Sequence, residues 1–124
     1  MREIKFRAWH KEQKKMYSAE EMGRDQLTLM PDGRGFANIS GKDTGLSRID
    51  DGRRMVPLQY TGLHDKNGKE IYEGDILATK NQYGKNDLVG QIAWIEKEAR
   101  FSTVYPLTRF EVIGNIYSNP ELLK

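Results

Sequence analysis

The residues best suited to chemistry lie in one stretch, 60–77, which reads YTGLHDKNGKEIYEGDIL. A metal-dependent hydrolase needs several carboxylates that converge on cations, and this stretch offers Glu70, Glu73 and Asp75 beside His64. The glycine between the last two acids indicates a turn, where aspartate usually bonds nearby backbone N–H groups. We therefore predict no catalytic residue and no metal site, and keep a hydrolase as the weakest alternative.

The same stretch carries two turn signals. Asn67 and Gly68 tolerate positive φ and predict a hairpin turn. Asp65 and Asn67 are spaced like the first two ligands of a calcium loop, but Lys69 occupies the third ligand position and Leu77 the twelfth, where a glutamate is needed. The predicted structural turn residues are Asp65, Asn67, Gly68, Gly74 and Asp75.

A second candidate site is basic and lies at the N-terminus. Residues 2–9 alternate, so we expect a strand that buries one face and exposes the other. Cations beside an aromatic ring could hold phosphates and stack a base, although a solvated strand face is the simpler interpretation. The candidate nucleic-acid-binding residues are Lys5, Arg7, Trp9, Lys11, Lys14 and Lys15.

Composition limits the classes of protein to consider. The chain has 124 residues, a net charge of +2, no cysteine and two histidines. Disulfides, thiol catalysis and zinc ribbons are excluded, and we expect no cofactor. The N-terminus lacks a signal peptide and no segment has the apolar length of a membrane span, so we expect a cytoplasmic protein without a membrane partner.

The predicted elements are mostly short strands. A hairpin at the N-terminus precedes a short helical turn over 18–25, capped by Ser18. Segments 87–96 and 100–105 should pair with each other, with Trp94 in the core and Tyr83 exposed. The other predicted strands are 27–30, 36–40, 55–63 and 109–117, and a short helical turn follows at Pro120.

This pattern predicts a mainly β protein, either a small barrel or a strongly curved antiparallel sheet with short helical turns. The length suits a single domain over 1–124 with one core. Residues 41–54 contain few apolar side chains and three glycines, so we predict a flexible loop there.

Three blocks of sequence resemble the YopX family, small proteins encoded by phages and prophages of bacteria. They are MREIKFRAW at the start, YTGLHDKNGKEIYEGDIL in the middle and FEVIGNIYSNPELL at the end. The resemblance implies a phage or prophage origin, the cytoplasm of a bacterial host and a β-rich fold. It implies no known reaction and no assigned catalytic residues.

We therefore expect a small interaction module rather than an enzyme. The expected partner is a host or phage protein, and a homo-oligomer is left open. The aromatic residues expected at the surface of this module are Trp9 and Tyr83. The first alternative is a nucleic-acid-binding protein that uses the basic N-terminal hairpin.

Overall fold

The computed structural model of the chain describes residues 3–38, 49–50, 54–102, 104 and 106–123. These residues fall into two compact units, an N-terminal unit Lys5–Gln59 and a C-terminal unit Tyr60–Lys124 that also includes Met1–Ile4. Each unit buries an apolar cluster of its own, in place of the one core expected from the length. The assignment of 1–124 to a single domain stays a prediction.

The described elements are mainly strands, which confirms the predicted fold class, and one sheet curls into a half-barrel. The strands are β1 Phe6–His10, β2 Lys15–Tyr17, β3 Leu27–Leu29, β4 Phe36–Asn38, β5 Ile49–Asp50, β6 Met55–His64, β7 Glu70–Tyr72, β8 Asp75–Lys80, β9 Asn86–Gln91, β10 Trp94–Ile95, β11 Arg100–Phe101 and β12 Glu111–Asn115. The helical elements are α1 Ala19–Arg24, η1 Glu96–Glu98, η2 Leu107–Arg109 and η3 Pro120–Leu123. No helix among the described residues has the length and hydropathy needed to cross a membrane.

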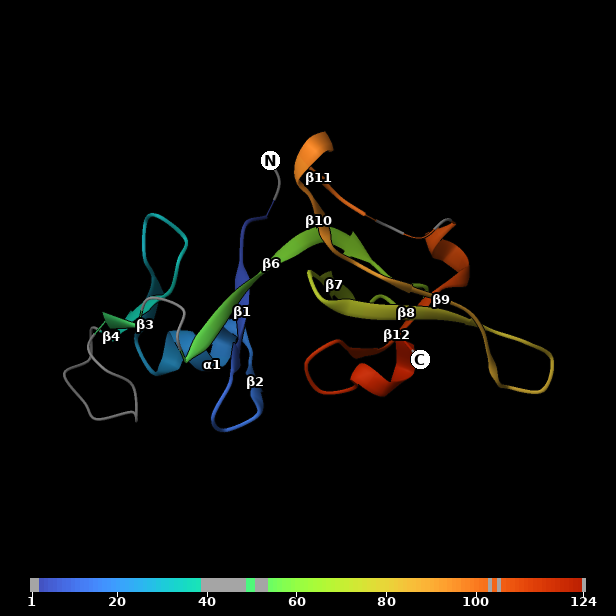
Figure 1. Cartoon of the computed structure of the whole chain (residues 1–124), viewed down its shortest axis with the longest axis horizontal. Helices are drawn as coiled ribbons and strands as arrows, with labels where there is room; N and C mark the ends of the chain where they lie inside the picture. Colours follow the sequence, from blue (N-terminus) through green and yellow to red (C-terminus); the bar gives the residue numbers. More distant parts are fainter. Residues whose placement is uncertain (1–2, 39–48, 51–53, 103, 105, 124) are drawn as a thin grey trace. The chain divides into compact units, whose positions relative to one another are not determined.

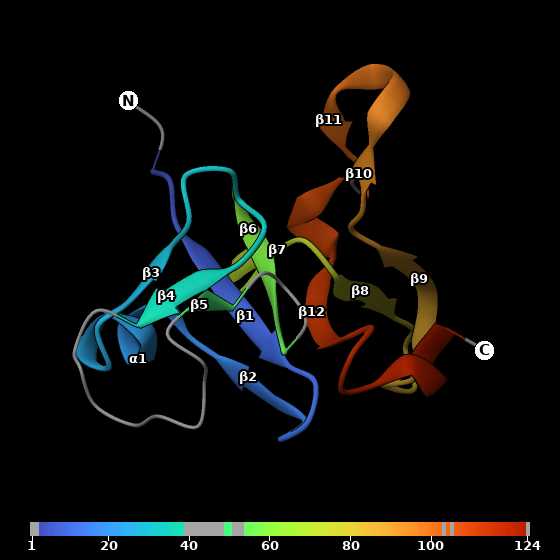
Figure 2. The same cartoon turned by 60° about the vertical axis from the view of Figure 1, so that its left-hand side comes forward.

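In the N-terminal unit, β1 lies between β2 and the first half of β6, and all these pairs are antiparallel. Figure 2 shows α1 beside β3, which pairs with β4, and β4 in turn pairs with β5. Ser18 caps α1 through the predicted capping box, since its hydroxyl accepts the Glu21 N–H while the Glu21 carboxylate accepts the Ser18 N–H. The helix continues past Gly23 and ends at Arg24, within the predicted range 18–25.

The predicted loop 41–54 is only partly within the described residues. Of this segment the structure describes residues 49–50 and Arg54, and residues 49–50 form β5. Residues 41–48 and 51–53 lie outside the described part of the chain. The prediction of a flexible loop is therefore not tested for those residues. The short strand β5, inside the predicted loop, was not expected from the sequence.

In the C-terminal unit, β8 is the central strand and pairs with β12 on one side and β9 on the other (Figure 1). The second half of β6 pairs with β7, with a bulge between the pairs Tyr60–Tyr72 and His64–Glu70. Gly62 lies in this bulge with φ +86°, a conformation that glycine adopts without strain. The buried cluster of this unit consists of Ile71, Leu77, Ile92 and Phe110.

The predicted strand 87–96 is divided in the structure. Its first part, β9, pairs with β8, and only Trp94 and Ile95, which form β10, pair with β11 as expected. The break falls at Ile92, because its N–H still bonds the Asp75 carbonyl on β8 while the chain beyond it turns to β11. Ile92 is therefore the core residue, and Trp94 is 42% exposed rather than buried.

Candidate functional site

The first turn of the 60–77 stretch is organised by Asp65, which is only 7% exposed. Its Oδ1 accepts the backbone N–H groups of Asn67 at 2.8 Å and Lys69 at 2.9 Å. Its Oδ2 accepts the N–H of Val112, on β12, at 2.9 Å. Gly68 occupies the turn with φ +82°. One carboxylate thus holds both its own turn and a strand 47 residues away.

These bonds also set the ionisation of Asp65. Burial by itself raises the pKa of this carboxyl group, because an ion loses water there. The three backbone N–H groups favour the ionised form more strongly, so the pKa lies below its ordinary value. Asp65 is therefore a charged structural acceptor and a poor proton donor or acceptor for catalysis at neutral pH.

The second turn centres on Gly74 and Asp75. Gly74 has φ +89°, and a Cβ placed on it would lie 3.2 Å from the Tyr117 ring. The Asp75 carboxylate is buried and accepts the Tyr72 N–H at 2.8 Å. Gly74 also receives the Ile116 N–H at its carbonyl, so this turn joins the ends of β8 and β12.

The residues considered for a hydrolase do not form a metal-ligand set. His64 and Glu70 face each other across the β6–β7 pair, and the His64 ring lies 3.4 Å from the Tyr60 hydroxyl. Asp75 is buried in its turn. Throughout the described part of the chain, no three His, Asp or Glu side chains are grouped to hold a metal ion.

The basic N-terminal candidates do not form the expected exposed face. Ala8, Trp9 and His10 are consecutive and all buried, so both faces of β1 are covered. Trp9 is 8% exposed, which corrects the prediction of an exposed aromatic residue. Lys5 and Arg7, which precede Trp9 in the chain, are half-buried. The assignment of these residues to nucleic-acid binding stays a prediction.

The remaining basic candidates lie around the β1–β2 turn. Lys11 and Lys14 are exposed, and Lys14 has φ +52°. Lys15 forms an ion pair with Glu21 at 3.0 Å and lies over the Tyr17 ring at 4.4 Å. The hydrogen bond and charge of Glu21 raise the pKa of Lys15, so it stays protonated.

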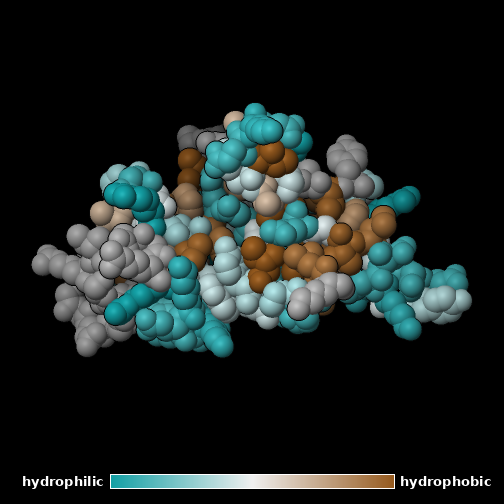
Figure 3. All heavy atoms as spheres, in the orientation of Figure 1, coloured by the Kyte–Doolittle hydropathy of each residue, from teal (hydrophilic) through white to brown (hydrophobic). Residues whose placement is uncertain are grey.

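Strand β9 presents an exposed apolar surface that the sequence analysis did not identify. Leu88 is 62% exposed and Val89 is 41% exposed, on opposite faces of the strand. In Figure 3 apolar side chains reach the surface in the region where Figure 1 draws β8 and β9. The sequence signal for this surface was the adjacent pair Leu88 and Val89. Neighbouring side chains on a strand point to opposite faces, so in a strand with one buried face they cannot both reach the core.

Among the described residues, β9 is an edge strand of its sheet, and the Val104 side chain lies against Gly90 on one face of it. The N–H groups of Leu88 and Ile92 point toward β8, where they donate to Thr79 Oγ1 and the Asp75 carbonyl. Because backbone groups alternate along a strand, the N–H and C=O of Val89 point the other way. Farther along this edge, Ser102 donates its hydroxyl to the Gln91 carbonyl at 3.1 Å.

A shallow recess lies at the end of β9, with about 260 Å³ of space that opens to solvent. Its aromatic walls are Trp94 and Tyr117, and Glu73 is the charged residue among the described residues that line it. The remaining lining residues are Gly74, Gln91, Ile92, Ala93 and Ile116. The hydrogen bonds between Gly74 and Ile92 and between Ile116 and Gly74 hold these segments together.

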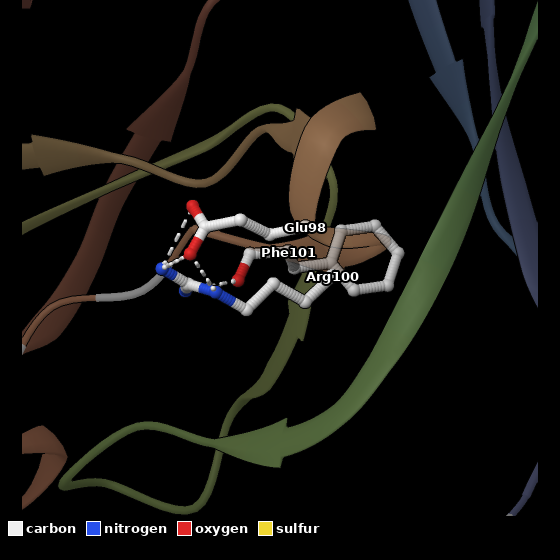
Figure 4. A network of polar contacts seen from close by, with 3 residues as sticks. All are labelled: Glu98, Arg100 and Phe101. Carbon is white, nitrogen blue, oxygen red and sulfur yellow. Dashed lines mark hydrogen bonds and ion pairs between the residues drawn. The ribbon is translucent and has the colours of Figure 1, made fainter.

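Trp94 is positioned by the β10–β11 hairpin. Its ring packs edge to face on Phe101, with ring centroids 5.0 Å apart. Figure 4 shows the Arg100 side chain directed to the Glu98 carboxylate and the Phe101 carbonyl, with N–O distances of 3.1–3.3 Å. These contacts link η1 to β11 across the short turn between the two strands.

A family model and two solved structures match this chain. The model of the YopX protein family matches residues 5–124. A crystal structure of an Enterococcus faecalis protein is similar over the full length of both chains, with 29% identity and a TM-score of 0.68. The YopX protein of Bacillus subtilis also aligns over both full lengths, with 20% identity and a TM-score of 0.58, which shows a shared fold. No curated protein matches the sequence.

The match to the family model covers nearly the whole chain. It includes the middle and last of the three blocks that carry the resemblance in full, and residues 5–9 of the first block. It confirms the relationship inferred from those blocks, and the two structures show that the fold is shared. The chain belongs to the YopX family.

Proposed function

We propose that this chain is a phage- or prophage-encoded interaction module that acts in the bacterial cytoplasm and binds an extended segment of a host or phage protein along β9. The observation that carries the proposal is that β9 is an edge strand among the described residues, with outward backbone groups at Val89 and apolar side chains on both faces. An added strand would complete hydrogen bonds that the described residues leave unmade, and Leu88 and Val89 would supply apolar contacts.

Other features support binding rather than catalysis. The carboxylates of Asp65 and Asp75 accept backbone N–H groups within the fold. Exposed edge strands with apolar side chains are uncommon because they pair with other chains. A protein that keeps such an edge uses it for association or protects it when no partner is present.

A substitution at Val89 tests this proposal directly. Val89→Pro removes the outward N–H while leaving the inward bonds of Leu88 and Ile92 in place, and proline is tolerated at such edge positions. Val89→Thr is the matched control, since it keeps the N–H and the branched shape. Tagged wild-type, Val89→Thr and Val89→Pro proteins are purified from lysogenic cells, and the co-purified proteins are quantified.

The expected result is a specific partner that is retained by wild type and Val89→Thr and weakened by about tenfold or more with Val89→Pro. Hydrogen exchange in the purified complex should then show protection at the Val89 amide. Equal retention by Val89→Pro, or protection confined to other strands, would contradict the proposal. Dimers detected by light scattering of wild type but not of Val89→Pro would identify a second copy as the partner.

Nucleic-acid binding is the alternative function, and the charge of the N-terminal unit favours it. Residues 5–59 carry +3, with eleven Lys or Arg against eight Asp or Glu, and the other unit, 1–4 with 60–124, carries −1, with nine against ten. Lys11 and Lys14 are exposed on one turn. If this function holds, affinity for DNA or RNA falls steeply with salt, and Lys11→Gln with Lys14→Gln makes that dependence shallower.

A further inference from the structure

We propose that Asn67 is a site of spontaneous deamidation and that the packing of its turn against β12 controls how fast the reaction runs. Asn67 is the one asparagine in the sequence that precedes a glycine. It is exposed, and a Cβ placed on Gly68 would meet no atom within 4 Å. An asparagine side chain reacts with the next backbone nitrogen most readily where that next residue has no side chain in the way. The reaction involves no partner, so the site is independent of the proposed function.

The reaction needs the two residues and water. The Gly68 backbone nitrogen loses its proton to solvent and bonds to Cγ of Asn67, the Cγ–Nδ2 bond breaks, and Nδ2 leaves as ammonia with a proton from solvent. Water then opens the resulting succinimide ring at either of its carbonyl groups. One opening gives aspartate at position 67, and the other gives isoaspartate, whose backbone is longer by a CH₂ group. Both products carry a carboxylate in place of the neutral amide.

The same turn occurs a second time in the chain, at residues 81–85. Asp65 in the first turn and Asn81 in the second each accept two backbone N–H groups at Oδ1, from the residues two and four positions later. In both turns the first N–H donates to the fifth carbonyl, and a glycine with positive φ donates to the first carbonyl. Tyr83 takes the place of Asn67 in the second turn. The local hydrogen bonding of the two turns is therefore matched.

The two turns differ in what holds them to the rest of the C-terminal unit. The first is attached to β12, because the Asp65 carboxylate accepts the Val112 N–H at 2.9 Å. The Asn67 amide itself donates to the Glu111 carboxylate, also on β12, at 3.2 Å. Residues 81–85 are all exposed. The chain thus contains a docked and an exposed example of one turn.

Docking on β12 slows the reaction in the folded protein. The Gly68 N–H that must lose its proton is bonded to the Asp65 carbonyl at 3.0 Å, and the Asn67 amide that is attacked is bonded to Glu111. A bonded backbone N–H gives up its proton to solvent when the local structure opens, and attachment to a second strand makes opening rarer. The products hinder closing, because a carboxylate at position 67 has no N–H to donate to Glu111 and repels its charge.

Mass spectrometry of the full-length protein tests the site. The protein is incubated at neutral pH, folded or in urea, and fragmentation of the intact chain locates the mass change from amide to carboxylate. We expect the change at position 67, about tenfold or more slower in the folded protein than in urea, and absent from Asn67→Gln, whose longer side chain forms the ring poorly. Absence of the product from the folded protein after prolonged incubation would overturn the site. Equal rates in the two states would overturn control by the fold.

A matched variant separates docking from the local turn. Tyr83→Asn places an asparagine before Gly84 in the exposed turn, where the local hydrogen bonds are the same. Because Tyr83 is 77% exposed, this variant should fold like the wild type, which circular dichroism checks. Within this one protein we expect position 83 to react about tenfold faster than position 67. Equal rates at the two positions would show that the following glycine alone sets the rate, and would overturn the inference.

Discussion

Two aspartates, one in each unit, show how the same turn chemistry is used at different depths. Asp32 in the N-terminal unit accepts the Arg34 N–H and pairs with the Arg34 side chain at 2.8 Å, all at the surface. Asp65 in the C-terminal unit is buried and bonds its own turn as well as Val112 on β12. A local turn signal thus becomes a tertiary link only when the turn is packed against another strand.

The buried clusters of the two units provide the largest expected effect. Leu77→Ala in the C-terminal cluster and Met55→Ala in the N-terminal cluster each remove a fully buried side chain. Each should lower the free energy of unfolding by about 2–5 kcal/mol. Chemical denaturation followed by circular dichroism measures the loss.

The same pair of variants tests the single-domain prediction. In one cooperative domain both substitutions move one common transition. Two transitions, of which Met55→Ala moves one and Leu77→Ala the other, would show that the units unfold independently and would contradict a single domain.

Asp65 should give the next largest effect. In Asp65→Asn the amide oxygen can keep the Asn67 and Lys69 bonds, but the amide nitrogen then faces the Val112 N–H, and two donors cannot bond each other. We expect a loss of roughly 1–3 kcal/mol at pH 7, measured by urea denaturation. Asp87→Asn, on the exposed strand β9, is the control and should leave the midpoint unchanged.

The pH dependence of this variant follows from the lowered pKa of Asp65. A depressed pKa in the folded state adds stability that is complete above the ordinary aspartate pKa of about 3.9. That contribution is lost as the pH falls below this value and through the lower folded pKa. The gap between wild type and Asp65→Asn should therefore narrow below about pH 4. A constant gap from pH 7 to pH 2 would contradict this role of the charge.

The helix cap of the N-terminal unit should have a smaller effect. Ser18→Ala removes the hydroxyl that accepts the Glu21 N–H, while Ser18→Asn replaces it with another good cap. The alanine variant should lose about 1 kcal/mol in thermal unfolding, and the asparagine variant should stay near wild type. Equal losses would show that packing of the serine, rather than capping, sets its contribution.

The surface turn at Asp32 should have the smallest effect. Asp32→Asn keeps an oxygen for the Arg34 N–H and removes only an exposed ion pair, which solvent and salt screen. Its melting temperature should match wild type within error. A loss of stability comparable to that of Asp65→Asn would show that the exposed turn and the buried turn contribute equally, which would contradict the comparison.

Local signals in the sequence were sufficient for many elements of the fold. The capping box at Ser18 and Glu21 specifies α1, and the Pro and Gly cluster between 27–30 and 36–40 specifies the β3–β4 hairpin. Such features depend on residues within a few positions of each other, so the sequence contains their full cause. The three sequence blocks at the start, middle and end of the chain were also sufficient to identify the family.

The sequence could not decide which faces and edges end up covered. Alternation predicted one exposed face for β1, but neighbours cover both, and Trp9 is buried while Trp94 is exposed. Nothing near Asp65 in the chain indicates that it also bonds Val112. The recess of Glu73, Trp94 and Tyr117 likewise joins three separate segments.

The sequence by itself therefore determined the family, the mainly β class, the turns and the cap, because these depend on short-range sterics and hydrogen bonds. Only the tertiary structure decided that β9 is an edge strand among the described residues, that the two turns of the 60–77 stretch link distant strands, and that a carboxylate meets two aromatic rings. Those features depend on which strands pair, and strand pairing is set by the burial of the whole chain rather than by any one segment.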